Sequence, residues 1–429
     1  MGFTWLSVNS DTGESLSQVN PFLKMAVGKD FVSILSFFDS PPPGLPDSQF
    51  LTGTGSPCEA PLGNNVKCLY PPSTVFDLQS LTEPQLKRVS RYVLQSVARS
   101  IIPEFAISKC LRVRQKDVEA VEVRKGKDRP YYGGLQHCHS VWSCPVCSAK
   151  IAEERREDLK TVVETWQAQG GTVLLVSYTV RHNIKQKLIE VLKKALHSRS
   201  LMMNRKSYRR LRARIGLAGS VRSLEVTYGE NGWHVHFHEI LFLNKLETFL
   251  EWCLTRSNNL EQIILPMWQD ACRSAGLSSP DHHGVKVQNG DKAGGYVAKW
   301  GMDSELTKGH IKQGREGHYT PWDFLRMCDQ GGRWGDLFRE YSRAFKGKRQ
   351  LFWSHGFRKL LNLGKEKTDE EIAGQIDELD PILGRPSWEE WRLILWKEVR
   401  GEFAEIAYIS SWQAAISFLY GLVGRGIMQ

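Results

Sequence analysis

The sequence predicts an α+β protein whose central unit is a split βαβ arrangement, in which an antiparallel sheet carries helices on one face. Period-two apolar runs and turn signals mark four strands, and helical periodicity marks two helices between them. The strands are expected at 172–180, 221–228, 233–243 and 284–288, and the helices at 184–199 and 246–275. Because the third strand of this topology is central, 233–243 is expected in the middle of the sheet.

A cysteine-bearing module precedes this unit, and helical regions follow it. Residues 1–75 are rich in Pro, Gly and Ser, which predicts a loosely ordered region with at most one short apolar element near 31–38. From Thr82 to Ile102 the pattern is helical. Five regions are predicted: the N-terminal region at 1–75, a helical region with the cysteine module at 76–168, and the central unit at 169–304. A basic helical extension at 305–365 and a C-terminal helical region at 366–429 follow.

The composition is that of a globular protein with an anionic partner. Apolar residues make up 41% and charged residues 24% of the 429 residues, and the net charge is +10 at pH 7. The positive balance favours nucleic acid as the partner. The N-terminus shows no secretory signal pattern, and its first positive charge is Lys24. The longest uncharged stretch, 407–423, is short for a membrane span. Nine cysteines, an odd number, favour a reducing cytoplasm over a disulfide framework.

Three histidines alternate on one predicted strand. A strand of period two places the imidazoles of His234, His236 and His238 on the same side. The whole chain has 12 histidines, so this set is concentrated. Neutral imidazole is a common metal ligand, which makes the strand a candidate metal site. The alternative is a solvated strand face that carries histidines.

A carboxylate is expected opposite the histidines. The turn Gly229-Glu230-Asn231-Gly232 closes a hairpin, and a symmetric hairpin places Glu225 opposite His236. The register is an assumption, because a slip of one residue would turn Glu225 to the other face. Two imidazoles and one carboxylate, with His234 as a further candidate ligand, suit Mg²⁺ or Mn²⁺.

Four cysteines form a second candidate metal site. Cys144-Pro145-Val146-Cys147 is a CxxC pair, Cys138 lies six residues upstream of it, and Cys110 supplies a fourth thiol. Four thiolates that include a CxxC pair are typical of a structural zinc site. The alternatives are a redox dithiol, ordinary buried cysteines, and replacement of one thiolate by His137 or His139.

Tyr296 is a candidate nucleophile. It follows the last predicted strand and is expected on a helix, where Lys292 and Lys299 share its face at i−4 and i+3. Two neighbouring ammonium groups favour the phenolate and attract a phosphate, so Lys292 is a candidate DNA-binding residue. The alternative is a tyrosine that packs on an amphipathic helix.

These motifs resemble those of the HUH endonucleases, and among them the rolling-circle replication initiators of bacterial plasmids. Residues 233–238 are similar to the family's histidine–hydrophobic–histidine strand, and residues 295–299 to its Tyr-x-x-Lys motif. Residues 138–147 resemble a cysteine module that precedes the nuclease domain in many initiators. The resemblance spans about 108–375, and it implies that 169–304 is the HUH nuclease domain.

The resemblance implies metal-dependent, site-specific nicking and rejoining of one DNA strand. A divalent ion on His236, His238 and Glu225 would polarise the scissile phosphate. Tyr296 would form a 5′-phosphotyrosine, and Lys299 would stabilise the reacting oxygens. The free 3′-hydroxyl would prime synthesis at an origin that is single-stranded or forms a cruciform, with host helicase and polymerase as partners.

The chain departs from the family pattern at two positions. Glu239 stands where a hydrophobic residue usually follows the histidine pair, which implies an ion pair with a helix or a local bulge. Lys292 occupies the position of an acid that some relatives use in termination, which leaves that step open. An HUH transposase is an alternative function, although many of these carry two tyrosines on the catalytic helix. A non-catalytic, zinc-containing DNA-binding regulator is an alternative from another class.

Overall fold

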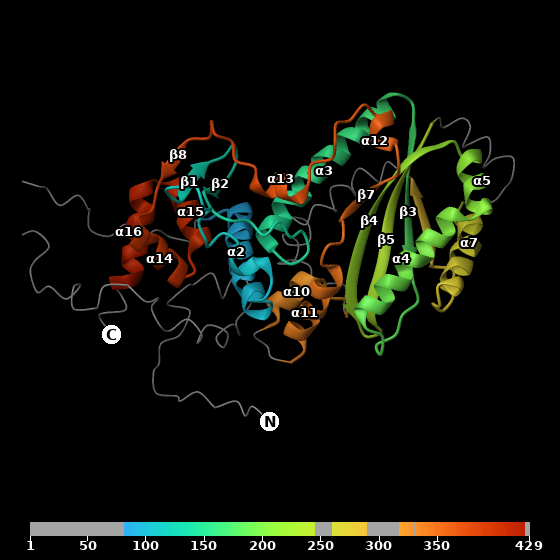
Figure 1. The fold of residues 1–429 in the computed structure, drawn as a ribbon, viewed down its shortest axis with the longest axis horizontal. Helices are drawn as coiled ribbons and strands as arrows, with labels where there is room; N and C mark the ends of the chain where they lie inside the picture. Colours follow the sequence, from blue (N-terminus) through green and yellow to red (C-terminus); the bar gives the residue numbers. More distant parts are fainter. Residues whose placement is uncertain (1–80, 245–259, 290–316, 329–331, 425–429) are drawn as a thin grey trace, which may run out of the picture.

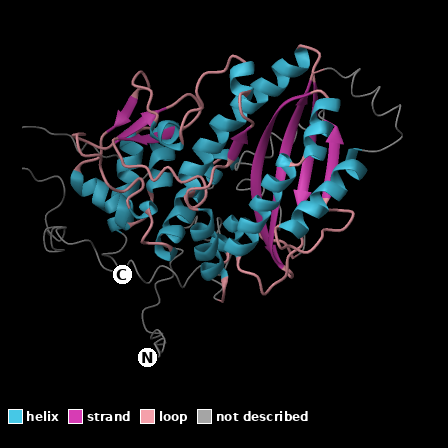
Figure 2. Ribbon diagram, turned by 45° about the vertical axis from the view of Figure 1, so that its right-hand side comes forward, coloured by secondary structure: helices cyan, strands magenta, loops and turns pink. Residues whose placement is uncertain are grey.

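The computed structural model describes residues 81–244, 260–289, 317–328 and 332–424, and it combines two antiparallel sheets with helices (Figure 1). Figure 2 shows the sheets as two separate groups of strands. The larger sheet has the order β6-β3-β5-β4-β7. Its strands are β3 (Thr172–Thr179), β4 (Leu217–Gly229), β5 (Gly232–Leu243), β6 (Val285–Asn289) and β7 (Leu351–Trp353). The predicted α+β class is confirmed, and β5, which carries the histidines, is the middle strand.

The hairpin of β4 and β5 has the predicted register. Gly229 pairs with Gly232, and Glu225 pairs with His236, as a symmetric hairpin requires. Gly232 has a φ of 86°, a left-handed conformation that glycine adopts readily. A side chain at this position would also come within 2.8 Å of the Cα of Ile184. The turn therefore determines which face of the sheet Glu225 occupies.

Among the described residues, three helices cover the sheet face opposite the histidines. Tyr178 and Phe237, from adjacent strands, pack against Trp268 with ring centroids 5.3 Å and 6.3 Å away. Figure 1 shows two of these helices side by side over the strands. The helices are α4 (Leu188–Asn204), α5 (Lys206–Arg214) and α7 (Leu260–Ser274). The helix predicted at 184–199 thus begins later than expected and is followed by α5, which the sequence did not predict.

The histidine face is covered over part of its length, which corrects the prediction of helices on one face only. Helix α3 (Pro145–Ala168) packs its Leu159 and Trp166 against the sheet, with Trp166 at 6.0 Å from Phe242 between ring centroids. The alternation of buried and partly exposed residues along β5 ends at Phe237, because every residue from there to Leu243 is buried. Strand residues that are apolar on both faces require cover on both. The part of the face that α3 leaves uncovered is therefore the end that bears the histidines, where Glu225 is about one third exposed and His238 is buried.

A second unit contains the cysteine module and the C-terminal region. Strand β8 pairs with β1, and the hydroxyl of Tyr132 on β2 donates to the backbone oxygen of Arg400 at 2.8 Å. Figure 1 shows the C-terminal helices beside α2, the first helix described. The elements are α2 (Glu83–Ile101), η5 (Ala106–Ser108), β1 (Glu122–Lys125), β2 (Pro130–Gly133), β8 (Ile382–Gly384), α14 (Trp388–Trp396), α15 (Arg400–Ile409) and α16 (Trp412–Gly424).

Residues 317–369 connect the two units and contain one strand that the sequence did not predict. The region 305–365 was expected to be helical, but β7 extends the larger sheet at the edge of β4. The helices here are α10 (Pro321–Arg326), α11 (Trp334–Phe345), α12 (Phe357–Leu360) and α13 (Asp369–Gly374). None of the helices described could span a bilayer, given their length and polarity. The expectations for residues 1–75 and for a helix over 246–259 lie outside the described residues.

Candidate metal centres

Glu225, His236 and His238 meet on the open part of the larger sheet. The Nε2 atoms of His236 and His238 each lie 2.8 Å from the same oxygen, Oε2 of Glu225. Neighbouring ligands of an octahedral ion with bonds of about 2.1 Å are about 3 Å apart. The three donors therefore fit adjacent positions around one small divalent ion, which Glu225, His236 and His238 would hold.

A serine on the neighbouring strand orients one of the two imidazoles. The hydroxyl of Ser177, on β3, lies 2.8 Å from Nδ1 of His238, and the two residues pair in the β3–β5 ladder. A hydrogen bond at one ring nitrogen leaves the other as the ligand and fixes the plane of the ring. The sequence analysis did not identify Ser177. The available signal was a polar residue directly after the apolar run 173–176, within the predicted strand 172–180.

The carboxylate of Glu225 is held in its ionised form. Burial opposes ionisation, but the two neighbouring imidazoles hold the pKa of Glu225 well below its ordinary value of 4.5. An ionised carboxylate between two imidazoles is an arrangement that a cation would stabilise, because all three groups present lone pairs. The side chain remains about one third exposed, so an ion could reach it from solvent.

His234 does not join this set, although the sequence analysis treated it as a candidate ligand. Its ring stacks on that of His182 with centroids 5.0 Å apart. Burial, with a contribution from His236, lowers the pKa of His234 to about 3, so its imidazole is neutral at physiological pH. Only Glu225, His236 and His238 bring their donor atoms within 4.8 Å of one another here, among the residues described.

A cavity next to Glu225 contains two arginines. Arg155 and Arg156 of α3 line it together with Glu225, and Trp142 and Trp322 form apolar walls. The Nε of Arg155 is buried without a hydrogen-bond partner among the described residues. The cavity therefore combines aromatic surface with two guanidinium groups beside Glu225; Arg155 pairs with Asp369, and Arg156 pairs with Glu153 and Glu157.

Glu239, the departure from the family pattern, forms a buried ion pair. Its side chain is 1% exposed and contacts the guanidinium of Arg199 on α4. The only register shift in the β4–β5 ladder lies between Leu217 and Gly219, away from Glu239. Of the two explanations that the sequence allowed, the structure supports the ion pair with a helix.

The four predicted cysteines converge on one point in the second unit. The Sγ of Cys110 lies 3.9 Å from that of Cys144 and 3.5 Å from that of Cys147, and Cys138 lies 3.8 Å from Cys147. A tetrahedral ion with bonds of about 2.3 Å would place its sulfur ligands about 3.8 Å apart. The set fits such an ion with Cys110 as the fourth ligand, and neither His137 nor His139 belongs to it.

The start of helix α3 presents two of these thiols. Cys144 is the residue that precedes the helix, and Cys147 lies in its first turn, where the helix dipole favours thiolate. Burial opposes ionisation of Cys144, but hydrogen bonds from the other three thiols hold its pKa well below the ordinary value of 9.0. The cluster thus favours one anionic sulfur, that of Cys144, whereas contacts with the other thiols raise the pKa of Cys138 and Cys147 well above 9.0.

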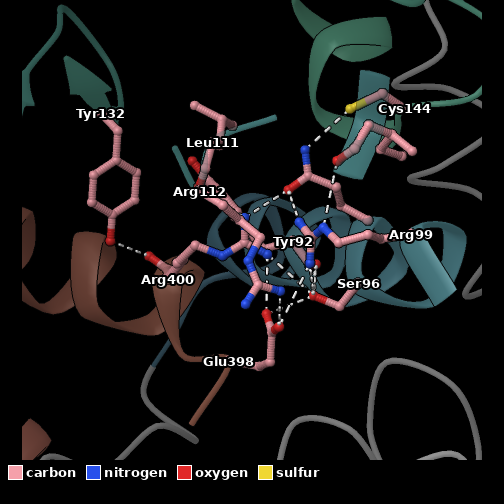
Figure 3. A network of polar contacts seen from close by, with 11 residues as sticks. Tyr92, Ser96, Arg99, Leu111, Arg112, Tyr132, Cys144, Glu398 and Arg400 are labelled. Atoms are coloured by element: carbon pink, nitrogen blue, oxygen red, sulfur yellow. Dashed lines mark hydrogen bonds and ion pairs between the residues drawn. The ribbon is translucent and has the colours of Figure 1, made fainter. Parts of the chain in front are cut away.

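A buried polar network surrounds this cluster. The side-chain amide of Gln95 donates to Sγ of Cys144 at 3.1 Å, and Arg400 donates to the amide oxygen of Gln95 at 2.9 Å. Figure 3 shows Arg99, Arg112 and Arg400 directed at the carboxylate of Glu398. Their nitrogens lie 3.5 Å, 3.1 Å and 3.1 Å from it, respectively. One carboxylate of the C-terminal region therefore offsets part of the positive charge packed behind the cysteines.

Tyr296, Lys292 and Lys299 lie outside the described residues. The described residues before this segment end at Asn289, the last residue of β6, and they resume at residue 317. Strand β6 pairs with β3 at the edge of the sheet. Their predicted roles therefore stay predictions.

The chain belongs to the replication protein family. The family model described as "Replication protein" matches residues 134–393, more than half of the chain. A Streptomyces lividans protein named "Protein rep" is 26% identical over 327 residues, which are 58% of this chain and 68% of that protein. A Streptomyces cyanogenus protein named "Neomycin resistance protein" is 26% identical over 215 residues, which are 43% of this chain and 48% of that protein. No solved structure matches the chain significantly.

Proposed function

We propose that this protein is a plasmid rolling-circle replication initiator that nicks one DNA strand at a specific site and rejoins it. The observation that carries the proposal is the contact of His236 and His238 with one oxygen of Glu225, in a protein of the replication family. Two imidazoles and a carboxylate with open positions beside them are suited to hold a metal ion that activates a phosphate.

The sheet topology supports assignment of the larger sheet to the HUH nuclease fold. Counted along the predicted unit, the strands β3, β4, β5 and β6 have the spatial order 4-1-3-2, with all pairs antiparallel. This is the order of a split βαβ unit, whose helices α4 and α7 are the two crossovers. The histidines on the middle strand then face away from those helices, where DNA can approach.

The reaction would be a transesterification at phosphorus. A bound Mg²⁺ or Mn²⁺ would supply Lewis-acid polarisation of the scissile phosphate. The phenolic oxygen of Tyr296 would lose its proton and attack, and the bond from phosphorus to the 3′ oxygen would break. A 5′-phosphotyrosine and a 3′-hydroxyl would remain, and attack by a 3′-hydroxyl would rejoin the strand. Lys299 would stabilise the phenolate, which is needed because an unperturbed phenol has a pKa of about 10.

The surrounding residues would hold and orient the substrate. Glu225, His236 and His238 would bind the metal ion, and Ser177 would fix the ring of His238. Arg155 and Arg156, which line the cavity beside Glu225, would contact phosphates of the bound strand. Lys292 would add a phosphate contact beside the nucleophile. The DNA must be unpaired at the nick, because a duplex would keep the scissile phosphate away from Tyr296.

The cysteine cluster would hold one Zn²⁺ in a structural role. All four positions of a tetrahedral site are taken by thiolates, which leaves none for substrate. A member of this function class would act in the cytoplasm, where its plasmid and the host helicase and polymerase are present.

The test is covalent trapping with the full chain. Wild-type protein, incubated with DNA from its own origin and Mn²⁺, should give a detergent-stable adduct whose nucleotide maps to the peptide with Tyr296. Tyr296→Phe, and separately the double variant His236→Ala/His238→Ala, should give neither adduct nor nick while duplex binding persists. An adduct on another tyrosine would refute the nucleophile, and full activity in excess EDTA would refute the metal mechanism. A wild type that binds DNA without nicking under any metal condition would favour the regulator alternative.

A further inference from the structure

Helix α5 presents four cations on one face. Its buried residues are Tyr208 and Leu211, and the opposite face carries positions spaced three and four residues apart. Every charged residue on that opposite face is exposed and basic: Lys206, Arg209, Arg210 and Arg214. The helix rise of 1.5 Å per residue spreads these cations over about 12 Å.

These four cations have no acidic partner in the part of the chain that the structure describes, in contrast to arginines close by. Arg199 pairs with Glu239, and Arg205 and Arg273 both pair with Asp270. No such pair involves the exposed face of α5. Like charges four residues apart, as in Lys206–Arg210 and Arg210–Arg214, destabilise a helix. The exposed face of α5 therefore carries basic side chains that repel one another, at positions where acidic residues would have removed the repulsion.

The helix is held firmly in place without a ligand. Tyr208 is 2% exposed, and burial raises its pKa well above the ordinary value. Arg205, at the start of the helix, is anchored to α7 through Asp270. Because the cationic face is already formed, an anionic partner would gain the attraction without the cost of ordering a loop.

We propose that the outer face of α5 binds the phosphate backbone of the duplex DNA that flanks the nicked segment. Four cations over about 12 Å match a polymer with one phosphate per about 3.4 Å along each strand. The helix lies on the sheet face opposite Glu225, His236 and His238, and Figure 1 shows it at the end of the molecule far from α16. It thus contacts a part of the DNA that is not at the nick. The inference rests on the proposed function only in taking DNA as the partner.

The experiment measures duplex binding of the full chain across salt concentrations, by fluorescence anisotropy with a labelled duplex and without divalent metal. Each phosphate contact contributes about 0.9 to the slope of log K against log salt concentration. Arg209→Ala/Arg210→Ala should therefore reduce the slope by about 2 and weaken binding at low salt more than at high salt. Arg209→Lys/Arg210→Lys should keep the wild-type slope.

The matched control removes two positive charges elsewhere. Lys160 and Lys367 are each about half exposed and are paired with Glu164 and Glu154. Lys160→Ala/Lys367→Ala should leave the slope unchanged. An unchanged slope in Arg209→Ala/Arg210→Ala, or an equal fall in the control, would overturn the proposal.

Single-stranded cleavage separates this proposal from the nuclease proposal. Arg209→Ala/Arg210→Ala should cut a single-stranded origin oligonucleotide at the wild-type rate, because α5 faces away from the histidines. A slope change with no cleavage by any form of the protein would support α5 and refute the nuclease function. A variant that loses single-stranded cleavage in parallel with duplex binding would contradict the separate location of the α5 contact.

Discussion

The ring of His238 is fixed through both of its nitrogens. Glu225 contacts Nε2 and Ser177 contacts Nδ1, each at 2.8 Å. The residue on the other side of His238 in the sheet, Ser223, is also a buried serine, but no hydrogen bond from it to the imidazole is present among the described contacts. The chain therefore offers two serines next to one ligand, of which one supports the ring.

Ser177→Ala should weaken metal binding at the Glu225 site by about 10- to 100-fold, the usual effect of removing a hydrogen bond that orients a ligand. Titration calorimetry with Mn²⁺ would measure this, and the melting temperature should change little. Ser223→Ala is the matched control and should bind Mn²⁺ as the wild type does. Equal affinities for wild type and Ser177→Ala would show that the ring needs no such support.

Glu398 is the single carboxylate among three arginines of the described network, of which Arg99 and Arg400 are buried and Arg112 is partly exposed. Burial opposes its ionisation, but Arg400, Arg99 and Arg112 hold the pKa of Glu398 below the ordinary value of 4.5. The folded state therefore binds fewer protons at this site than the unfolded state does near that pH. The resulting stability is fully present above pH 4.5 and is lost as the pH falls toward the folded-state pKa.

Glu398→Gln should destabilise the protein at pH 7 by about 3–5 kcal/mol, because it leaves buried guanidinium groups without a counter-charge. Denaturant unfolding between pH 3 and 7 would measure the effect, and the difference between variant and wild type should shrink as the pH falls below 4.5. A difference that stays constant with pH would mean that the charge of Glu398 contributes nothing. The surface variant Glu389→Gln should match the wild type throughout.

Among the elements, α3 links the two metal centres. Its 24 residues, about 36 Å long, begin among the cysteines and end on the larger sheet. Figure 1 shows it running from the region beside α2 to the strands. Leu159 and Trp166 fix its far end, and Cys144 and Cys147 lie at its start. A metal ion at the cysteines would therefore stabilise the helix that also carries Arg155 and Arg156 to the cavity beside Glu225.

Purified protein should contain about one zinc ion per chain by elemental analysis, and Cys144→Ser should lose it. Binding by four thiolates supplies folding free energy, so the variant should unfold at a lower temperature and exchange α3 amides faster. Cys328→Ser is the control, since Cys328 lies outside the cluster and its hydroxyl replacement can still donate to Phe324. A zinc-free wild type, with a soluble and stable Cys144→Ser, would refute the structural zinc site.

At the scale of the whole molecule, the C-terminal region completes the unit that contains the cysteines. Strand β8 pairs with β1, Glu405 on α15 pairs with Arg88 on α2, and Glu398 neutralises the buried arginines. The two ends of the described chain thus pack together, and their buried residues belong to the same apolar cluster as Val235 and Phe237 of the larger sheet. The two units are connected through α3 and through the segment from β7 to α13.

A chain that ends at Gln375 should lose the fold of the cysteine unit. The truncation exposes an edge of β1 and leaves Arg99 and Arg112 without Glu398, a loss of more than about 5 kcal/mol, which is comparable to the stability of a domain. Limited proteolysis should cut between residues 81 and 135 much faster, and the zinc content should fall. A chain that ends at Gly424 serves as the control. Unchanged protease resistance in the shorter chain would contradict this.

The sequence by itself determined the local parts of the fold and site. The hairpin turn and the two-residue period fix the pairing of Glu225 with His236 across only 11 residues, so geometry along the chain was sufficient. The same holds for Cys138, Cys144 and Cys147, which lie within ten residues. Helical periodicity likewise predicted α2 to within one residue of its observed bounds.

Only the tertiary structure decided the contacts between distant segments. It brought Cys110 to the other cysteines, Ser177 to His238 and β8 to β1, and it placed His234 against His182 instead of the carboxylate. It also added β7 to the sheet and α3 to the histidine face. The register between strands that no short turn connects depends on how their side chains pack across the core. The periodicity of the sequence contains no information on that packing, because the residues that determine it are dozens to hundreds of positions apart.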